Sequence, residues 1–91
     1  VSMISTTDID RQNRFLRLYE LQRNALWRFV RSMVRTEHEA EDLVSETILQ
    51  AYQALHRLHD DKAFVSFMFT IAHRIVRRYQ WRRSCRSHSR R

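Results

Sequence analysis

The 91-residue chain contains no glycine, no proline and a single cysteine. Without glycine it cannot build the Gly-rich loops that hold phosphates in nucleotide-binding proteins, and the tight turns of β-hairpins become unfavourable. One cysteine, Cys85, excludes a disulfide scaffold and is typical of a reducing compartment, so we expect a cytoplasmic protein. No apolar run approaches the roughly 18 residues that span a bilayer, so we expect no membrane insertion.

Acidic residues are missing from the last third of the chain. Residues 1–63 hold nine Lys/Arg and all ten Asp/Glu, whereas residues 64–91 hold eight arginines and no acid. Arginine binds phosphate in a bidentate manner and stacks on bases. The asymmetry favours nucleic acid as a partner at this end, with a basic segment that only improves solubility as the alternative.

Hydrophobic periodicity predicts an all-α fold, a compact bundle of three main helices whose long third helix has a basic C-terminal end. We expect helices over residues 8–35 and 36–58, the second with Thr36 as its N-cap, and a third that begins after a cap at Asp60 or Asp61. Glutamate three residues after a threonine, as at the start of the second helix, is the spacing of a capping box.

The chain divides by this pattern into a helical domain over residues 1–83 and a basic, flexible tail or linker over residues 84–91. On the third helix, a polar stripe lies opposite the apolar one and holds Thr70, His73, Arg74, Arg77, Arg78, Trp81 and Arg82. Aromatic rings beside arginines suit single-stranded nucleic acid, and the candidates are Phe69, Tyr79 and Trp81. Tyr79 also continues the apolar stripe, so the core is its favoured place.

Catalytic and metal chemistry find little support in this sequence. No nucleophile–base set is visible, so we predict that the protein is not an enzyme and needs no cofactor. Two pairs of residues have the i,i+3 spacing of a zinc site, namely His56 with His59 and Cys85 with His88. The second pair lies in the arginine-rich tail, and we interpret these histidines as incidental surface residues.

Two stretches of the chain have a distinctive wording. Residues 40–47 read AEDLVSET and are followed by AYQAL at 51–55, and residues 63–74 read AFVSFMFTIAHR. Together they resemble region 2 of bacterial RNA polymerase sigma factors of the extracytoplasmic-function group, whose usual wording is AEDLVQETFLRAWRAL followed by SFRAWLYRIARN. The resemblance extends over about residues 15–83 and runs without a gap through the loop between the two segments.

The resemblance implies two binding faces. Core RNA polymerase would bind the polar face of the second helix through the clamp helices of its β′ subunit, at the positions Asp42, Ser45, Glu46 and Gln50. The loop and the third helix would capture the melted non-template strand of the promoter's minus-ten element, with one base flipped into a pocket made largely by the loop. The matching positions are Leu58, His59, Asp60, Asp61, Lys62, Arg74, Arg77, Arg78, Trp81, Arg82 and Arg83.

Several positions depart from the family's wording. They are Ser45 for glutamine, Leu58 for phenylalanine, Asp60 for glycine, Phe67 for tryptophan, Arg74 for asparagine and Arg78 for aspartate. An anti-sigma factor is a further partner that the resemblance implies, and we expect a monomer. The main alternative is a basic helical protein–protein adaptor without sequence-specific DNA binding. A peripheral membrane binder ranks last, because the apolar stripe of the third helix is long enough to be a core.

Overall fold

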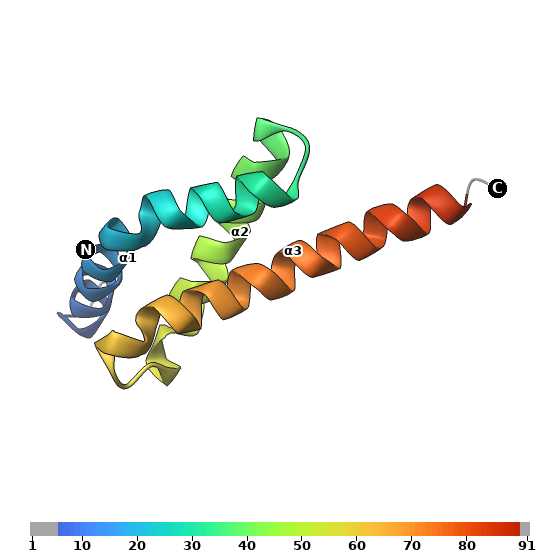
Figure 1. The fold of residues 1–91 in the computed structure, drawn as a ribbon. Coiled ribbons are helices and arrows are strands. Elements are labelled where there is room, and N and C mark those ends of the chain that lie inside the picture. The colour runs from blue at the N-terminus through green and yellow to red at the C-terminus, as the bar shows by residue number, and fades with distance from the viewer. Residues whose placement is uncertain (1–5, 90–91) are drawn as a thin grey trace, which may run out of the picture.

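Three long helices follow one another in the computed structural model, which describes residues 6–89. They are α1 (Thr6–Met33), α2 (Glu37–Gln53) and α3 (Phe64–Ser89), with 3₁₀ turns η1 (Leu55–Arg57) and η2 (Asp61–Ala63) between α2 and α3. No strand occurs in this range, so the prediction of an all-α bundle is confirmed. Figure 1 shows α3 extending well past the other two helices, and the molecule measures 54 × 30 × 22 Å.

Side chains from all three helices meet in one core. Phe15 of α1 stands edge-on to Tyr52 of α2 and to Phe64 of α3, with ring centroids 5.5 and 5.9 Å apart. Such edge-to-face pairs add roughly 0.5–1.5 kcal/mol each beyond burial. The core continues along the bundle through Leu26, Val30, Leu43, Leu55, Met68, Ile71, Ile75 and Val76. The core therefore fixes how α3 lies against α1 and α2.

The turn from α1 to α2 contains the predicted capping box. Thr36 accepts a hydrogen bond from the Glu39 backbone N–H at 3.1 Å, and Glu39 Oε1 accepts from the Thr36 N–H, also at 3.1 Å. The Arg35 N–H donates to the same carboxylate oxygen. The start of α2 is thus fixed by residues that the sequence had identified.

The predicted end of the second helix is wrong, because α2 stops at Gln53 and not near Leu58. Ala54 has φ −97° and ψ 5°, η1 follows, and Leu58 is already extended with φ −90° and ψ 113°. Leu55 and Leu58 are both buried. A 3₁₀ turn keeps residues i and i+3 on one side, so the apolar pattern continues after the α-helix has ended.

The other boundaries lie close to those predicted, with one exception. Asp60 caps the entry to α3, since its Oδ1 accepts from the Lys62 backbone N–H at 3.0 Å. The exception is the end of α3, which continues through Ser89; residues 90 and 91 of the predicted tail lie outside the described residues. Neither glycine nor proline is present to stop the helix. Among the described residues, no helix is both long and apolar enough to cross a membrane.

Candidate functional site

The outer face of α2 carries the four residues predicted to bind a protein partner. Asp42, Ser45 and Glu46 are exposed and Gln50 is half-buried. Gln50 Nε2 donates to Glu46 Oε2 at 3.1 Å, one helical turn away. This hydrogen bond orients the Glu46 carboxylate without neutralising it. The face therefore presents acidic groups to solvent in a defined arrangement.

An apolar groove of about 530 Å³ borders this acidic face, between α1 and α2. Leu16 and Leu49 line it and are 52% and 56% exposed, and Ser45 belongs to the same wall. Exposed apolar surface beside polar groups is typical of protein interfaces. Leu16 was not predicted, because it lies off the apolar stripe of its helix and nothing local in the sequence distinguishes it.

The basic face of α3 is in place as predicted. Arg74, Arg78 and Arg82 follow one another at i,i+4 spacing and therefore share one side of the helix. Arg77 is exposed beside them, and none of these four arginines forms an ion pair with a described residue. Trp81 is 66% exposed among them. The result is a row of unpaired guanidinium groups with one exposed indole ring.

Two of the predicted aromatic candidates lie elsewhere. Tyr79 is half-buried and its hydroxyl donates a hydrogen bond to Glu39, which agrees with its place on the apolar stripe. Phe69 is half-buried and stands edge-on to Phe29, with ring centroids 5.7 Å apart. Trp81 is therefore the aromatic residue on α3 that is most available for stacking.

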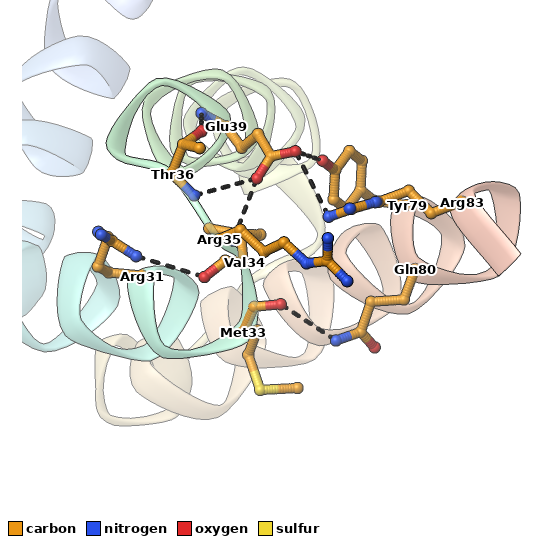
Figure 2. A network of polar contacts seen from close by, with 9 residues as sticks. All are labelled: Arg31, Met33, Val34, Arg35, Thr36, Glu39, Tyr79, Gln80 and Arg83. Carbon is orange, nitrogen blue, oxygen red and sulfur yellow. Dashed lines mark hydrogen bonds and ion pairs between the residues drawn. The ribbon is translucent and has the colours of Figure 1, made fainter. Parts of the chain in front are cut away.

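Arg83 differs from the other arginines of α3. Its Nη1 lies 3.5 Å from Glu39 Oε2, and its guanidinium lies 5.9 Å from the centroid of the Tyr79 ring. Gln80 directly follows Tyr79 in α3, and its Nε2 donates to the Met33 carbonyl at 3.2 Å. Figure 2 shows these contacts converging on the turn between α1 and α2. They fix the second half of α3 to that turn, and they draw Arg83 away from the unpaired row.

The Glu39 carboxylate is the centre of this network. The hydrogen bond from Tyr79, supported by the backbone N–H groups of Thr36 and Arg35 and by the charge of Arg83, lowers the pKa of Glu39 to about 2. Partial burial opposes this shift but is outweighed. Burial, and then the hydrogen bond to Glu39, raise the pKa of the Tyr79 hydroxyl. Over the physiological pH range, Glu39 is therefore an ionised carboxylate that accepts the hydrogen bond, and Tyr79 is a neutral hydroxyl that donates it.

The loop before α3 is held by α1. Arg14 donates to Asp61 Oδ1 and to the Leu58 carbonyl, with nitrogen–oxygen distances of 2.7 and 3.0 Å, and Arg17 lies 3.5 Å from Asp61 Oδ2. The Leu58 side chain is buried. Two of the five loop residues predicted to bind DNA are therefore engaged in holding the fold.

The remaining three loop residues differ among themselves. Asp60 uses its carboxylate as a cap, as described above. His59 and Lys62 are exposed, and no hydrogen bond or ion pair joins their side chains to the described part of the chain. These two are the loop residues that remain available to a ligand.

Two hollows lie along α3, one beside the loop and one beside η1 and the end of α2. The first, which we call the loop hollow, has a volume of about 460 Å³ and is lined by Leu58, Ala63, Ser66, Phe67 and Thr70. The second, the polar hollow, has about 400 Å³ and is lined by Gln50, Gln53 and His56. Both also share a wall made of Ala54, Arg57, Ile71 and Arg74. Of the predicted loop residues 58–62, Leu58 alone lines either hollow, and most of the other residues that line the loop hollow belong to α3.

Arg57 is a candidate that the sequence analysis missed. It is exposed and lines both hollows together with Arg74. It is also the sole arginine between residues 36 and 73, which was the signal available. In the sequence, Arg57 lies in the part of the chain that holds all the acidic residues, so it was not grouped with the basic segment. Its position beside α3 follows from the tertiary structure alone.

Comparison with known proteins gives one family and one relative. Residues 18–90 match the family Sigma-70 region 2. The ECF RNA polymerase sigma factor SigM of Bacillus subtilis (strain 168) is 34% identical over 55 residues, which cover 60% of this chain and 33% of that protein. The chain thus spans about a third of the length of this relative. No solved structure matches.

Proposed function

The chain belongs to the sigma-70 region 2 family, and from this premise we propose that it is the promoter-recognition domain of a transcription initiation factor of the extracytoplasmic-function group. Factors of this family are not enzymes. The domain would join core RNA polymerase on one face and hold promoter DNA on another. The observation that carries the proposal is that α2 exposes the carboxylates of Asp42 and Glu46, whereas α3 exposes arginines that have no acidic partner among the described residues.

Polymerase would dock on α2 through the clamp helices of the β′ subunit. The exposed carboxylates of Asp42 and Glu46 offer charge complementarity, and the apolar groove beside Ser45 offers surface that gains from burial. Ser45 stands where the family has glutamine, so at this position the contact has a hydroxyl in place of an amide. An anti-sigma factor, where one exists, would compete for one or both faces.

The melted non-template strand would lie along α3. The unpaired arginines would hold its phosphates, and Trp81 would stack against a base. The loop hollow, about 460 Å³ and walled by Leu58 and Phe67, is large enough to receive a flipped base. Flipping costs a few kcal/mol, which contacts inside such a hollow offset. No covalent step is involved, since the domain captures a strand.

The polymerase contact is tested by Glu46→Arg, with Glu41→Arg as the matched control. Both residues are exposed on α2, but they lie about 140° apart around the helix axis. We expect Glu46→Arg to abolish binding to a β′ clamp-helix fragment while circular dichroism shows an intact fold, and Glu41→Arg to bind nearly as well as wild type. Undiminished binding by Glu46→Arg would refute the proposed contact.

The DNA contact is tested by selection from a randomised pool of single-stranded DNA at two salt concentrations. Enrichment of a defined motif of about six bases supports promoter reading. Binding without enrichment, collapsing as salt rises, would mean that the arginine face grips phosphate alone. The domain would then be better explained as a protein–protein adaptor whose function depends on the partner that binds α2.

A further inference from the structure

Arg57 and Arg74 occupy a special position between the two hollows. Arg57 ends η1 and Arg74 lies in the first half of α3, and both line the loop hollow and the polar hollow. Neither guanidinium has an ion pair or hydrogen bond with any residue that the structure describes. No Asp or Glu is found among the residues that line the two hollows. Two arginine side chains without a partner among the described residues therefore border hollows that are large enough for a nucleobase.

Arginine discriminates among bases by the geometry of its donors. The guanidinium fork presents two parallel N–H groups, which match two adjacent acceptors on one edge of a base. Guanine offers O6 and N7, and cytosine offers O2 and N3. On adenine and thymine each acceptor has a donor or a carbon atom as its neighbour, so the fork finds one partner at most. A lysine at the same place would lack the fork and with it this selectivity.

We propose that Arg57 and Arg74 read the base held in the loop hollow and select guanine or cytosine over adenine and thymine. This inference rests on the proposed capture of a single strand. It assigns to Arg57 a role in base selection, and it assigns to Arg74 a contact with a base edge, in addition to the phosphate contacts of the α3 row. The hydroxyl groups of Ser66 and Thr70 also line the loop hollow, on the same side of α3 as Arg74, and add to the polar groups around the base.

The experiment is selection from a randomised single-stranded DNA pool with the 91-residue protein and four variants. Arg57→Ala and Arg74→Ala remove one fork each, Arg74→Lys keeps the charge but not the fork, and Arg77→Ala is the control, an exposed arginine of the same helix that lines neither hollow. We expect wild type to require guanine or cytosine at one position. The first three variants should lower that preference by about 5- to 150-fold, the range for one bidentate pair. Arg77→Ala should weaken all sequences alike and keep the preference.

Two outcomes would overturn the inference while leaving strand capture intact. One is a wild-type motif that contains adenine or thymine at every selected position. The other is a uniform loss of affinity in Arg57→Ala and Arg74→Ala, as in the Arg77→Ala control, with the motif unchanged. Complete absence of single-strand binding by the wild type would instead overturn the proposed function together with this inference. Circular dichroism of each variant establishes that the changes do not come from unfolding.

Discussion

Helices α1 and α3 are both rich in arginine, but four of the six arginines of α1 face acids, and Arg28 and Arg31 alone have no acidic partner among the described residues. On α1, Arg11 and Arg23 pair with acids one turn away, and Arg14 and Arg17 pair with Asp61 of the loop. On α3, four of the arginines with described side chains have no acidic partner, and Arg83 alone is held by a carboxylate. A count of cations therefore does not locate a nucleic-acid face. The proposed nucleic-acid face is instead the row of α3 cations that has no counter-charge among the described residues.

The largest effect should come from removing charge on the two helices separately. We expect Arg78→Ala combined with Arg82→Ala to lower affinity for single-stranded DNA on the order of 10- to 100-fold at low salt. The slope of log affinity against log salt should fall by about 1.4, because each lost phosphate contact contributes about 0.7. Titrations by fluorescence anisotropy at several salt concentrations measure both quantities.

The matched variant for this test is Arg11→Ala combined with Arg23→Ala, which removes the same charge from α1. Its arginines already face carboxylates, so affinity should stay within about twofold of wild type. Equal losses of affinity in the two double variants would show that net charge alone governs binding. The difference proposed between the paired arginines of α1 and the unpaired arginines of α3 would then be wrong.

The second test concerns what the paired arginines of α1 do for the fold. Arg14 joins α1 to the loop through both the Asp61 carboxylate and the Leu58 carbonyl, and its side chain is 29% exposed. We expect Arg14→Ala to lower the free energy of unfolding by about 1.5–3 kcal/mol, the range for hydrogen bonds to charged groups. Urea denaturation followed by circular dichroism measures the change.

Arg23→Ala is the control for this stability test. Arg23 and Glu20 form an exposed i,i+3 pair, with side chains 60% and 66% exposed, so its loss should cost less than about 0.5 kcal/mol. A destabilisation of equal size in both variants would mean that the contacts to the loop contribute no more than a surface pair does.

Sequence patterns predicted the local parts of this comparison and missed the distant ones. The acid-free segment after residue 63 located the unpaired arginines, and the spacing of Thr36 and Glu39 located the start of α2, because both are encoded within a few residues. The pairing of Arg14 with Asp61 joins residues 47 positions apart and has no local signature. The same holds for Arg57, which becomes a partner of Arg74 only when η1 packs beside α3.

The end of α2 was misjudged for a related reason. Leu55 and Leu58 satisfy the apolar period of an α-helix, and they satisfy that of a 3₁₀ turn equally well. Periodicity therefore predicted that both would be buried, which is confirmed, but it could not tell which backbone buries them. That difference decides the shape of the loop hollow, which is lined by Arg57 of η1 as well as by Leu58.

A smaller effect is expected from the one carboxylate that binds an arginine of α3. The pKa of Glu39 is lowered to about 2 in the folded protein, below its ordinary value of 4.5. Its contribution to stability is therefore present in full above about pH 4.5, and it is lost as the pH falls toward 2. We expect Glu39→Gln to remove this part of the acid dependence, so that the melting temperature of the variant falls less steeply than that of wild type between pH 5 and 2.

Glu41→Gln serves as the control, because Glu41 is an exposed acid on the same helix with no hydrogen bond or ion pair to the described residues. It should retain the wild-type slope. If Glu39→Gln also retained that slope, the network around Tyr79 would not be coupled to folding, and the bracing of α3 by the turn would have to be abandoned.

The smallest effect should come from Arg83, and it sharpens the comparison within α3 itself. Arg82 and Arg83 are neighbours of the same residue type, but Arg82 is exposed and unpaired while Arg83 lies against Glu39 and the Tyr79 ring. We expect Arg82→Ala to weaken single-strand binding by about tenfold and Arg83→Ala by less than about twofold. In the Glu39→Gln background Arg83 loses its counter-charge, so there Arg83→Ala should cost more affinity than it does in the wild type. A larger loss of affinity in that background would show that pairing with Glu39, and not position along the helix, keeps Arg83 from binding the single strand. Equal effects of Arg83→Ala in the two backgrounds would show that position along the helix decides.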